Sequence, residues 1–361
     1  MAKFMFRKKI VLVAPVGGEC NLRCKYCYHE GIRRDRVDVM NDKVLLGTIK
    51  AAVGLARQID FLWHGGESTL AGLNFYKKAV AWQREFLKGQ KVKNIIQTNG
   101  TLLTDEWAEF FSKEDFFVSI SIDGPQALHN ANRIFAGGRG SFEKVINGIN
   151  LIKEQQKVGL LCIVNSANVA YPEEIYAFMK STGNRGFEAN LCTETVEGVG
   201  HLIPSDEQAT KFFKRLFDLW FQDDQPSFRI RTFVNAIRAM VDGTPLDCSF
   251  AYNRCWLYLG IDERGDVYPC NRFLKVPEFY LGSVLEKSLS EIHETKKAKQ
   301  IYSEMPKIHG GCFRCKWWQN CGGGCAYDRW LIDRKFDSVH PQCAVRRRLF
   351  SHIEKKVGPF I

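Results

Sequence analysis

The sequence predicts an α/β fold, an open barrel of six βα units followed by a smaller cysteine-rich region. Two observations lead to this fold. Short apolar runs alternate with longer amphipathic runs from residue 10 to about residue 245, and cysteines crowd together from Cys248 onward. Such alternation is typical of a parallel sheet covered by helices. We therefore expect two domains, residues 1–245 and residues 246–361.

Each element of the first region follows from its local sequence. The strands expected are the apolar runs Ile10–Ala14, Ile59–Trp63, Asn94–Gln97, Phe117–Ile122, Gly159–Val164 and Phe187–Leu191. The helices expected are Asp42–Arg57, Leu73–Leu87, Asp105–Ser112, Phe142–Glu154, Pro172–Met179, Ser205–Phe221 and Phe233–Val241. Asn41, Thr104 and Ser141 stand where helix N-caps are expected. Six units are too few to close an eight-stranded barrel, so we expect a partial (β/α)6 barrel of the TIM type with a wide mouth.

The region after Cys248 has a different pattern. Only Leu289–Met305 has the periodicity of a helix, and glycine is frequent. Apolar residues look too sparse to order this segment alone. A region of about 95 residues built on loops usually needs metal or covalent staples.

The chain has thirteen cysteines in 361 residues, and their role depends on the cellular compartment in which the protein lies. The first apolar run, Ile10–Pro15, is too short for a secretion signal, and no stretch approaches the ~18 apolar residues of a membrane span. We therefore expect a cytoplasmic protein without a membrane partner, whose clustered cysteines are metal ligands rather than disulfides. The formal net charge of +11 falls to roughly +6 if eleven thiolates hold three cluster cores of about +2 each, so we expect no nucleic-acid partner.

The first motif with chemical meaning is Cys20-x3-Cys24-x2-Cys27, in the loop after the first strand. Three thiolates at this spacing can hold three irons of a four-iron cluster and leave the fourth iron open, which marks a reactive centre. The run Cys-Asn-Leu-Arg-Cys-Lys-Tyr-Cys-Tyr at 20–28 resembles the signature of the radical S-adenosylmethionine (SAM) superfamily. That resemblance implies that SAM binds the open iron and is cleaved reductively to a 5′-deoxyadenosyl radical, which takes a hydrogen atom from the substrate.

Residues at the carboxyl ends of the next strands resemble further SAM-binding motifs of that family. The run from His64 to Glu67 is similar to the family's Gly-Gly-Glu motif, which contacts the SAM amino group. Barrel enzymes keep their active sites at this end of the strands. By similarity, Ser121 and Arg133 are expected at the ribose and carboxylate of SAM. The full set of SAM-binding residues expected is Tyr28, His64, Gly65, Gly66, Glu67, Asn99, Ser121 and Arg133.

The second motif fills the C-terminal region. Its cysteines run Cys255-x9-Gly265-x4-Cys270, Cys312-x2-Cys315-x5-Cys321-x3-Cys325 and Cys343, a pattern similar to the seven-cysteine SPASM domain. A zinc ribbon is the alternative, although only one Cys-x2-Cys pair occurs there. Cys248 raises the total to eight, enough for two closed four-iron clusters.

The resemblance also implies how these eight cysteines are shared. Auxiliary cluster I would take Cys248, Cys255, Cys270 and Cys325. Auxiliary cluster II would take Cys312, Cys315, Cys321 and Cys343. The cofactors expected are therefore three [4Fe-4S] clusters and SAM. Two cysteines remain: we expect Cys162 to be a buried apolar residue, whereas Cys192 either packs or faces the substrate.

Nearly the whole chain resembles the anaerobic sulfatase-maturating enzymes and their peptide-modifying relatives. The shared stretches are the cysteine loop, 64–72, 97–102, His129-Asn130 with Arg133, 216–220 and 315–317. Sulfatase maturases oxidise a Cys or Ser side chain to formylglycine, and an Asp after the third cysteine of the auxiliary region is thought to take the substrate proton. This chain has Asn271 there, and an amide is no general base. Asp328 is the other weak candidate for that role.

We therefore expect a maturase that crosslinks a ribosomally made peptide, with formylglycine formation as the alternative. The partners expected are a peptide or protein substrate, a leader peptide or separate recognition protein, and an electron donor such as flavodoxin or ferredoxin. Because the first strand begins by residue 10, we expect no appended leader-binding domain. A zinc-bearing nucleic-acid binder that uses the basic excess is the alternative from another class.

Overall fold

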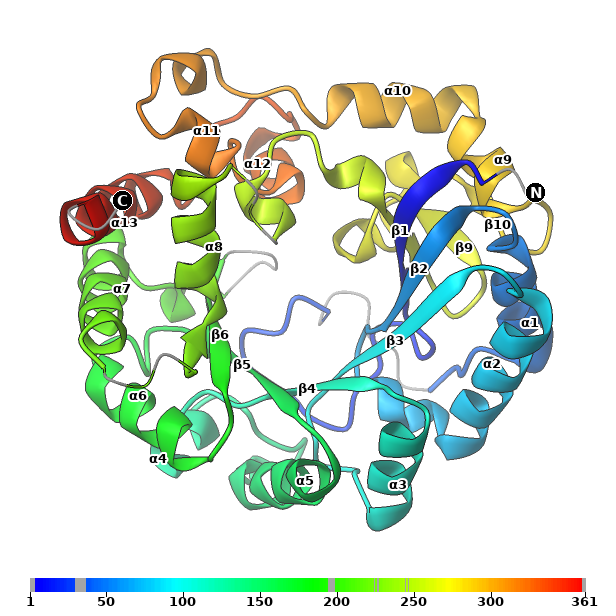
Figure 1. Cartoon of the computed structure of the whole chain (residues 1–361), viewed down its shortest axis with the longest axis horizontal. Coiled ribbons are helices and arrows are strands. Elements are labelled where there is room, and N and C mark those ends of the chain that lie inside the picture. Colours follow the sequence, from blue (N-terminus) through cyan, green and yellow to red (C-terminus); the bar gives the residue numbers. More distant parts are fainter. Residues whose placement is uncertain are drawn as a thin grey trace.

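The structure is a computed structural model that describes residues 4–29, 37–193, 199–223, 225, 227–243, 245 and 247–358. Its strands line the inner side of a ring whose outer side is helical (Figure 1). No helix within these ranges is long and apolar enough to cross a membrane.

The six predicted parallel strands are all present. They are β1 (Phe6–Val13), β2 (Ala56–Trp63), β3 (Lys91–Thr98), β4 (Phe117–Ser121), β5 (Val158–Val164) and β6 (Gly186–Leu191). Each pairs in parallel with the next along the chain. The outward-facing residues of the strands are apolar and buried, as in β5 with Val158, Leu160 and Cys162. The partial barrel expected from the sequence is therefore confirmed.

The helices of the barrel cover the outer face of this sheet (Figure 1). They are α1 (Asp42–Ala51), α2 (Leu73–Phe86), α3 (Asp105–Lys113), α4 (Gln126–Asn130), α5 (Phe142–Gln155), α6 (Pro172–Ser181), α7 (Asp206–Phe221) and α8 (Arg231–Val241). The predicted helix over 42–57 is too long, because β2 already begins at Ala56. Asn41 caps α1 by accepting the Val44 N–H at 3.0 Å. Thr104 and Ser141 occupy N-cap positions without a side-chain cap bond.

The C-terminal region extends the same sheet instead of forming a separate loop-built unit. The strands β8 (Tyr258–Ile261), β9 (Asp266–Tyr268) and β10 (Gly282–Ser283) continue it beyond β1, and β7 (Arg229–Ile230) continues it beyond β6. The strand β8 runs parallel to β1, with Ile10 opposite Tyr258 and Val13 opposite Ile261. The resulting order is β10-β9-β8-β1-β2-β3-β4-β5-β6-β7.

The helices of this region differ from the expected ones. The single helix predicted over 289–305 is two, α9 (Leu289–Glu294) and α10 (Lys296–Glu304), because Thr295 between them is extended and caps α10 through the Ala298 N–H. The helices α11 (Trp318–Cys321), α12 (Ala326–Asp333) and α13 (Cys343–Val357) were not predicted. The buried side of α13, with Leu349 and Ile353, packs against α7.

The expectation of sparse apolar packing in this region is also wrong. Phe273 and Phe279 lie with ring centroids 4.3 Å apart, and Trp330 lies 5.1 Å from Phe279. Tyr268 and Met305 complete this buried cluster. A few aromatic side chains bury a large area each, so an ordinary apolar count underestimates such a core.

Candidate functional site

The loop after β1 brings Cys20, Cys24 and Cys27 close together. The Cys27 N–H donates to the Cys24 carbonyl at 3.0 Å, and the Leu22 N–H donates to Cys20 Sγ at 3.3 Å. Burial and then Glu67 raise the pKa of the Cys20 thiol to about 12, and the Cys24 and Cys27 thiols add to this. Neighbouring buried thiolates repel one another unless a positive group lies among them, so this donor set fits a metal cluster.

The glycines of the 64–67 segment let the cysteine loop approach the end of β2. The Gly66 N–H donates to the Gly17 carbonyl at 2.8 Å, and the Glu67 N–H donates to the Glu19 carbonyl at 2.7 Å. A Cβ at Gly66 would lie 1.9 Å from the Glu19 carbonyl oxygen, and one at Gly65 would lie 2.6 Å from that of Gly17. These glycines therefore serve a contact between two parts of the chain, a reason that the sequence alone did not indicate.

The carboxylate of Glu67 is buried and ties β2 to β3. It accepts the Thr69 N–H at 3.1 Å, the Thr69 and Thr98 hydroxyls at 2.6 Å each, and the Asn99 N–H at 2.6 Å. Burial raises the pKa of this carboxyl, and the four hydrogen bonds oppose that rise. These bonds hold the Glu67 side chain in place at the end of β2, next to the cysteine loop.

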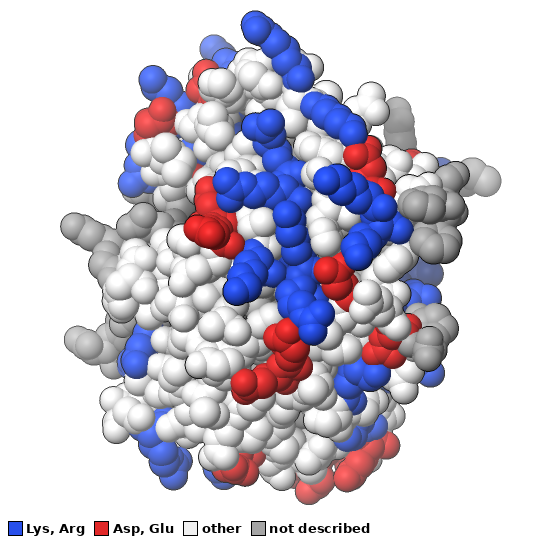
Figure 2. Space-filling view, turned by 90° about the vertical axis from the view of Figure 1, so that its left-hand side faces the viewer, with Lys and Arg blue, Asp and Glu red and all other residues white. Residues whose placement is uncertain are grey.

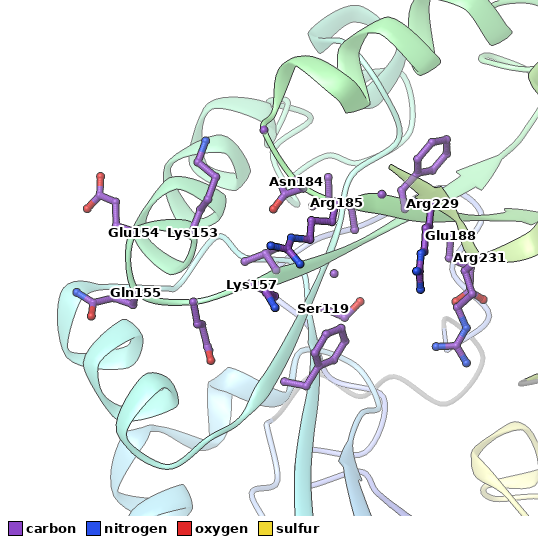
Figure 3. Close-up of a pocket in the computed structure, with 18 residues that line it drawn as sticks. Ser119, Lys153, Glu154, Gln155, Lys157, Asn184, Arg185, Glu188, Arg229 and Arg231 are labelled. Carbon is purple, nitrogen blue, oxygen red and sulfur yellow. The ribbon is translucent and has the colours of Figure 1, made fainter. Parts of the chain in front are cut away.

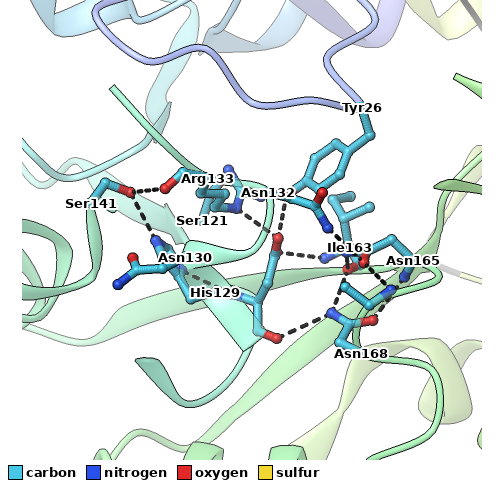
Figure 4. Close-up of polar contacts among 12 residues, drawn as sticks. Tyr26, Ser121, His129, Asn130, Asn132, Arg133, Ser141, Ile163, Asn165 and Asn168 are labelled. Atoms are coloured by element: carbon cyan, nitrogen blue, oxygen red, sulfur yellow. Dashed lines mark hydrogen bonds and ion pairs between the residues drawn. The ribbon is translucent and has the colours of Figure 1, made fainter. Parts of the chain in front are cut away.

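Arg133 and Tyr26 lie close together (Figure 4), and both contact Asp123, which follows β4. Asp123 Oδ2 lies 3.0 Å from Arg133 Nε and accepts the Tyr26 hydroxyl, while Oδ1 accepts the Ile163 N–H at 3.0 Å. Burial alone would lower the pKa of Arg133, but Asp123 and then Tyr26 raise it above its usual range. The guanidinium is therefore charged, and no pattern in the sequence indicated that Tyr26 and Asp123 would position it.

Asn99 and Ser121 lie at the ends of neighbouring strands. The Asn99 side-chain amide donates to Asn21 Oδ1 at 2.8 Å and approaches Cys20 Sγ at 3.6 Å. Ser121 Oγ accepts from Gln97 Nε2 at 2.9 Å. The structure thus brings the predicted residues of β3 and β4 to the edge of the sheet that carries the cysteine loop.

Asn271 joins the cysteine loop to the C-terminal region. Its Nδ2 donates to the Tyr28 hydroxyl at 2.9 Å and lies 3.2 Å from His64 Nδ1. Its Oδ1 is buried and has no hydrogen-bond partner among the described residues. Burial and then Arg272 lower the pKa of His64 to about 4, so His64 is neutral at pH 7.

Asp328 forms an ion pair with Arg272. Its Oδ1 lies 2.5 Å from Arg272 Nη2, and its Oδ2 lies 3.4 Å from His340 Nε2. Burial alone would raise the pKa of Asp328, but Arg272 and His340 hold it well below its usual range. A carboxylate stabilised to this degree is a poor proton acceptor.

The eight C-terminal cysteines form two groups. Burial and then Asp247 raise the pKa of the Cys248 thiol, with further increases from Cys325, Cys255 and Cys270. For Cys312 the rise comes from burial and then from the thiols Cys321, Cys343 and Cys315. These neighbours are the two sets implied by the family resemblance.

The described residues contain neither a disulfide nor a compact single-ion site. All thirteen cysteines lie in the described ranges, and none forms a disulfide. No three His, Cys, Asp or Glu side chains of those ranges meet closely enough to hold one metal ion. Cys162 is fully buried, and Cys192 is buried and packs with Tyr26 and Leu202.

A turn of three glycines separates the two cysteine groups. Gly322, Gly323 and Gly324 have φ values of 60°, 80° and 77°, and a Cβ at Gly322 would lie 2.5 Å from the Tyr252 nitrogen. Only glycine adopts this left-handed run readily. The turn therefore allows Cys321 and Cys325, four positions apart, to join different groups.

Buried Arg329 stabilises this turn, and it was not predicted from the sequence. It donates to the carbonyls of Gly323 at 3.0 Å, Gly324 at 2.7 Å and Met305 at 2.9 Å. Burial lowers the pKa of Arg329, while cysteines of both groups oppose that shift. Its position one helical turn after Cys325 is the only signal in the sequence that could have identified it.

A pocket of about 570 Å³ lies at the other end of the strands (Figure 3). It is lined by the first residues of β4, β5 and β6, namely Phe117, Val158 and Gly186. Arg231 Nε lies 3.3 Å from Glu188 Oε2 at one side of it. None of the predicted site residues lines this pocket, so it is separate from the candidate site.

Comparison with known proteins agrees with this geometry. The Radical SAM superfamily model matches residues 15–179, and the SPASM model, an iron-sulfur cluster-binding domain, matches residues 248–316. The chain is 32% identical over 341 residues to the cysteine-type anaerobic sulfatase-maturating enzyme of Clostridium perfringens, with 91% of each chain covered. It is 33% identical over 348 residues to the serine-type enzyme of Bacteroides thetaiotaomicron, covering 88% of this chain and 83% of that relative.

A solved structure shares the architecture. The structure of native anSMEcpe with bound AdoMet superposes with a TM-score of 0.88 at 29% identity, covering 97% of this chain and 98% of that one. The same protein has been solved with AdoMet and the Cp18Cys peptide. The likeness therefore spans the barrel and the C-terminal region together.

Proposed function

Because this chain belongs to the radical SAM enzymes that carry a SPASM domain, we propose that it oxidises a cysteine or serine side chain of a protein substrate to formylglycine. The observation that carries this proposal is the similarity to cysteine-type and serine-type maturases over more than four-fifths of their length. It supports formylglycine formation better than the peptide crosslinking that the sequence first indicated. The alternative of a zinc-bearing nucleic-acid binder is set aside, because the matching family models are those of the Radical SAM superfamily and of an iron-sulfur cluster-binding domain.

We propose that the three cysteine groups hold three [4Fe-4S] clusters. Cys20, Cys24 and Cys27 would hold the first, and its open iron would supply the site at which SAM is bound and cleaved. Two hydrogen-bond donors of the chain, the Leu22 N–H and the Asn99 side-chain amide, contact the proposed ligand atom Cys20 Sγ. Hydrogen bonds to a ligand sulfur tune the potential of the metal group.

SAM would lie along the carboxyl ends of β2 to β4. Arg133, kept charged and oriented by Asp123, suits the carboxylate of SAM. Ser121 and the backbone of 64–67 offer further polar contacts next to the cysteine loop. We retain Tyr28, beside Cys27, as a neighbour of the same cofactor.

The proposed oxidation needs an acceptor for one proton. The substrate CH2 group would give a hydrogen atom to the 5′-deoxyadenosyl radical, after which one electron would go to an auxiliary cluster and the proton of the hydroxyl or thiol to a base. Serine would then be the aldehyde, whereas cysteine would be a thioaldehyde that water converts to the aldehyde with release of sulfide. His64 lies beside Asn271, but burial and then Arg272 lower the pKa of His64 to about 4, so it is a poor proton acceptor. Asp328 is excluded from that role by its pairing with Arg272.

A second candidate function rests on one residue. Asn271 stands where the sequence resemblance expects the proton-accepting Asp, and an amide cannot accept that proton. A reaction that joins two side chains of a peptide would lose its proton from a different atom. Peptide crosslinking therefore remains the second candidate.

Anaerobic assay of the reconstituted chain with three synthetic peptides tests both candidates. The peptides carry Cys, Ser or Ala at one position of a sulfatase-type sequence, and the Ala peptide is the control. An aldehyde detected by mass spectrometry in the Cys or Ser product supports formylglycine formation. Loss of two hydrogens without an aldehyde supports crosslinking, and no SAM cleavage with any peptide overturns both proposals.

A further inference from the structure

The exposed side of α13 is strongly basic. Arg347, Arg348, Lys355 and Lys356 are exposed, and they project over one half of the helix, while the other half is buried against the protein. The neighbouring carboxylate of Glu354 is paired with Lys316 at 2.6 Å. Figure 2 shows a band of Lys and Arg down the side of the molecule that carries α7 and α13, with acidic residues at its edges.

Exposed aromatic side chains lie beside this basic side. Phe313 is 63% exposed and Tyr252 is 49% exposed. Trp318 joins them, with its ring 5.2 Å from that of Phe313 and 5.0 Å from that of Tyr252. Large aromatic residues at a surface, next to cationic ones, are typical of a protein interface.

Both features converge on the second group of C-terminal cysteines. Phe313 follows Cys312, and Trp318 donates its N–H to the Cys315 carbonyl at 3.0 Å. Cys343 is the first residue of α13, one turn before Arg347, and the Lys316–Glu354 ion pair ties the two segments together. Cys312 and Cys343 themselves remain partly exposed.

We propose that this surface, formed by Arg347, Arg348, Lys355, Tyr252, Phe313 and Trp318, is the docking site of an acidic electron-carrier protein. The proposal rests on the proposed function, in which Cys312, Cys315, Cys321 and Cys343 hold a cluster. The cations would attract a carrier of opposite charge, and the aromatic residues would form the contact nearest the cysteines. One electron would then pass between the carrier and that cluster, and no proton would accompany it. When the carrier is supplied in its reduced form, the carrier would be oxidised and the cluster reduced.

Charge reversal on α13 tests the docking site. Arg348→Glu/Lys355→Glu places two carboxylates on one side of the helix, and Lys77→Glu/Lys88→Glu makes the same change of charge at exposed sites on and after α2. The probe is a reduced acidic bacterial ferredoxin, mixed anaerobically with the cluster-loaded chain. Stopped-flow absorbance gives the rate of electron transfer, and biolayer interferometry gives association without turnover.

At low salt the α13 double variant should associate and accept electrons at least about tenfold more slowly than the unmodified chain. The difference should vanish at high salt, and the α2 control should behave as unmodified. Phe313→Ala should speed dissociation without removing the salt dependence. Equal rates for both double variants, or a loss of binding to a peptide substrate or to single-stranded DNA instead, would overturn the proposal.

A control with the chemical reductant dithionite distinguishes a failure of the docking site from a failure of the proposed function. Dithionite needs no docking surface, so the α13 double variant should cleave SAM with dithionite as fast as the unmodified chain. If neither protein cleaves SAM with dithionite, the proposed function has failed and not the docking site.

Discussion

The side chain of Asn271 donates a hydrogen bond to the Tyr28 hydroxyl across 2.9 Å, although the two residues are 243 positions apart. Tyr28 follows Cys27 of the first cysteine group, and Asn271 follows Cys270 of a C-terminal group. The contact therefore joins two proposed cluster sites.

The first prediction concerns Asn271→Asp. A carboxylate beside His64 and Arg272 would add a proton acceptor, and general bases contribute about 10²–10⁴-fold. If the chain makes formylglycine, the variant should make it at least about tenfold faster than the unmodified chain from pH 5.5 to 8, because an aspartate is already ionised over that range. The aldehyde yield measured over the same range checks this.

Asn271→Ala is the matched control, because it removes the Tyr28 contact without adding a base. It should not gain activity. An Asn271→Asp variant that also gains nothing would indicate that no proton is taken at this position.

The second prediction separates the first cysteine group from the others. Cys24→Ala should abolish 5′-deoxyadenosine production and leave about eight of about twelve irons bound, since two closed clusters remain. Iron analysis and chromatography of the reaction products measure both quantities. Cys162→Ala, a buried cysteine outside all three groups, should keep the full iron content and SAM cleavage.

The third prediction concerns Gly66→Ala. The added Cβ would lie 1.9 Å from the Glu19 carbonyl, so the cysteine loop must shift. We expect a loss of about 1–3 kcal/mol of stability together with weaker binding of SAM, measured by urea unfolding and by equilibrium dialysis. Gly137, whose Cβ would meet nothing within 4 Å, gives the control Gly137→Ala, and equal effects of the two changes would contradict the role given to Gly66.

The fourth prediction concerns Arg329→Lys. A lysine cannot serve the carbonyls of Gly323, Gly324 and Met305 together. The variant should lose about 2–4 kcal/mol of stability and release iron from both C-terminal groups during anaerobic gel filtration. Exposed Arg334 provides the control Arg334→Lys. Iron retained in full by Arg329→Lys would rule out its role between the groups.

The fifth prediction is a pH dependence from buried histidines. Burial lowers the pKa of His64, His129 and His340 to about 4 in each case. The unfolded chain binds protons at these positions below pH ~6.5 and the folded chain does not, so stability should fall as pH falls from ~6.5 toward 4. Each histidine lowers the free energy of unfolding by at most about 1.4 kcal/mol for each pH unit of acidification in this range.

Unfolding of the unmodified chain and of His129→Gln at pH 7.5 and 5.5 measures this effect. His129 Nδ1 accepts the Asp123 N–H at 3.3 Å and must therefore stay unprotonated. The variant should be less stable at pH 7.5 but should lose less stability on acidification. Parallel losses in the two proteins would contradict the prediction.

The barrel could be predicted from the sequence because its signals are local. The alternation along β5 and the Asn41 cap before α1 depend only on nearby residues. The pairing of β8 with β1 could not be predicted, because it joins Tyr258 to Ile10 and β8 has only four residues. The helix α13 was missed because Arg346 interrupts its apolar side and because that side meets a partner, α7, far away in the chain.

The site was predictable where the chemistry depends on spacing. The cysteine groups follow from motifs, whereas the hydrogen bonds of Glu67 to Thr69, Thr98 and Asn99 could not be predicted, because these partners come from two segments. Asp123 and Tyr26 act through a contact between distant elements, and Arg329 reaches the carbonyl of Met305 as well as the nearby glycine turn. No local pattern identifies such contacts.

The parallel pairing of β8 with β1 limits how this protein can be divided. A fragment ending near residue 245 would leave the β1 edge of the sheet without its neighbour, and a bare parallel edge invites self-association. Chimaeras that exchange the C-terminal part between relatives should therefore carry β1 along with it. For protein engineering, the junction suggested by the two family models is a border in the sequence that does not match the border of a folding unit.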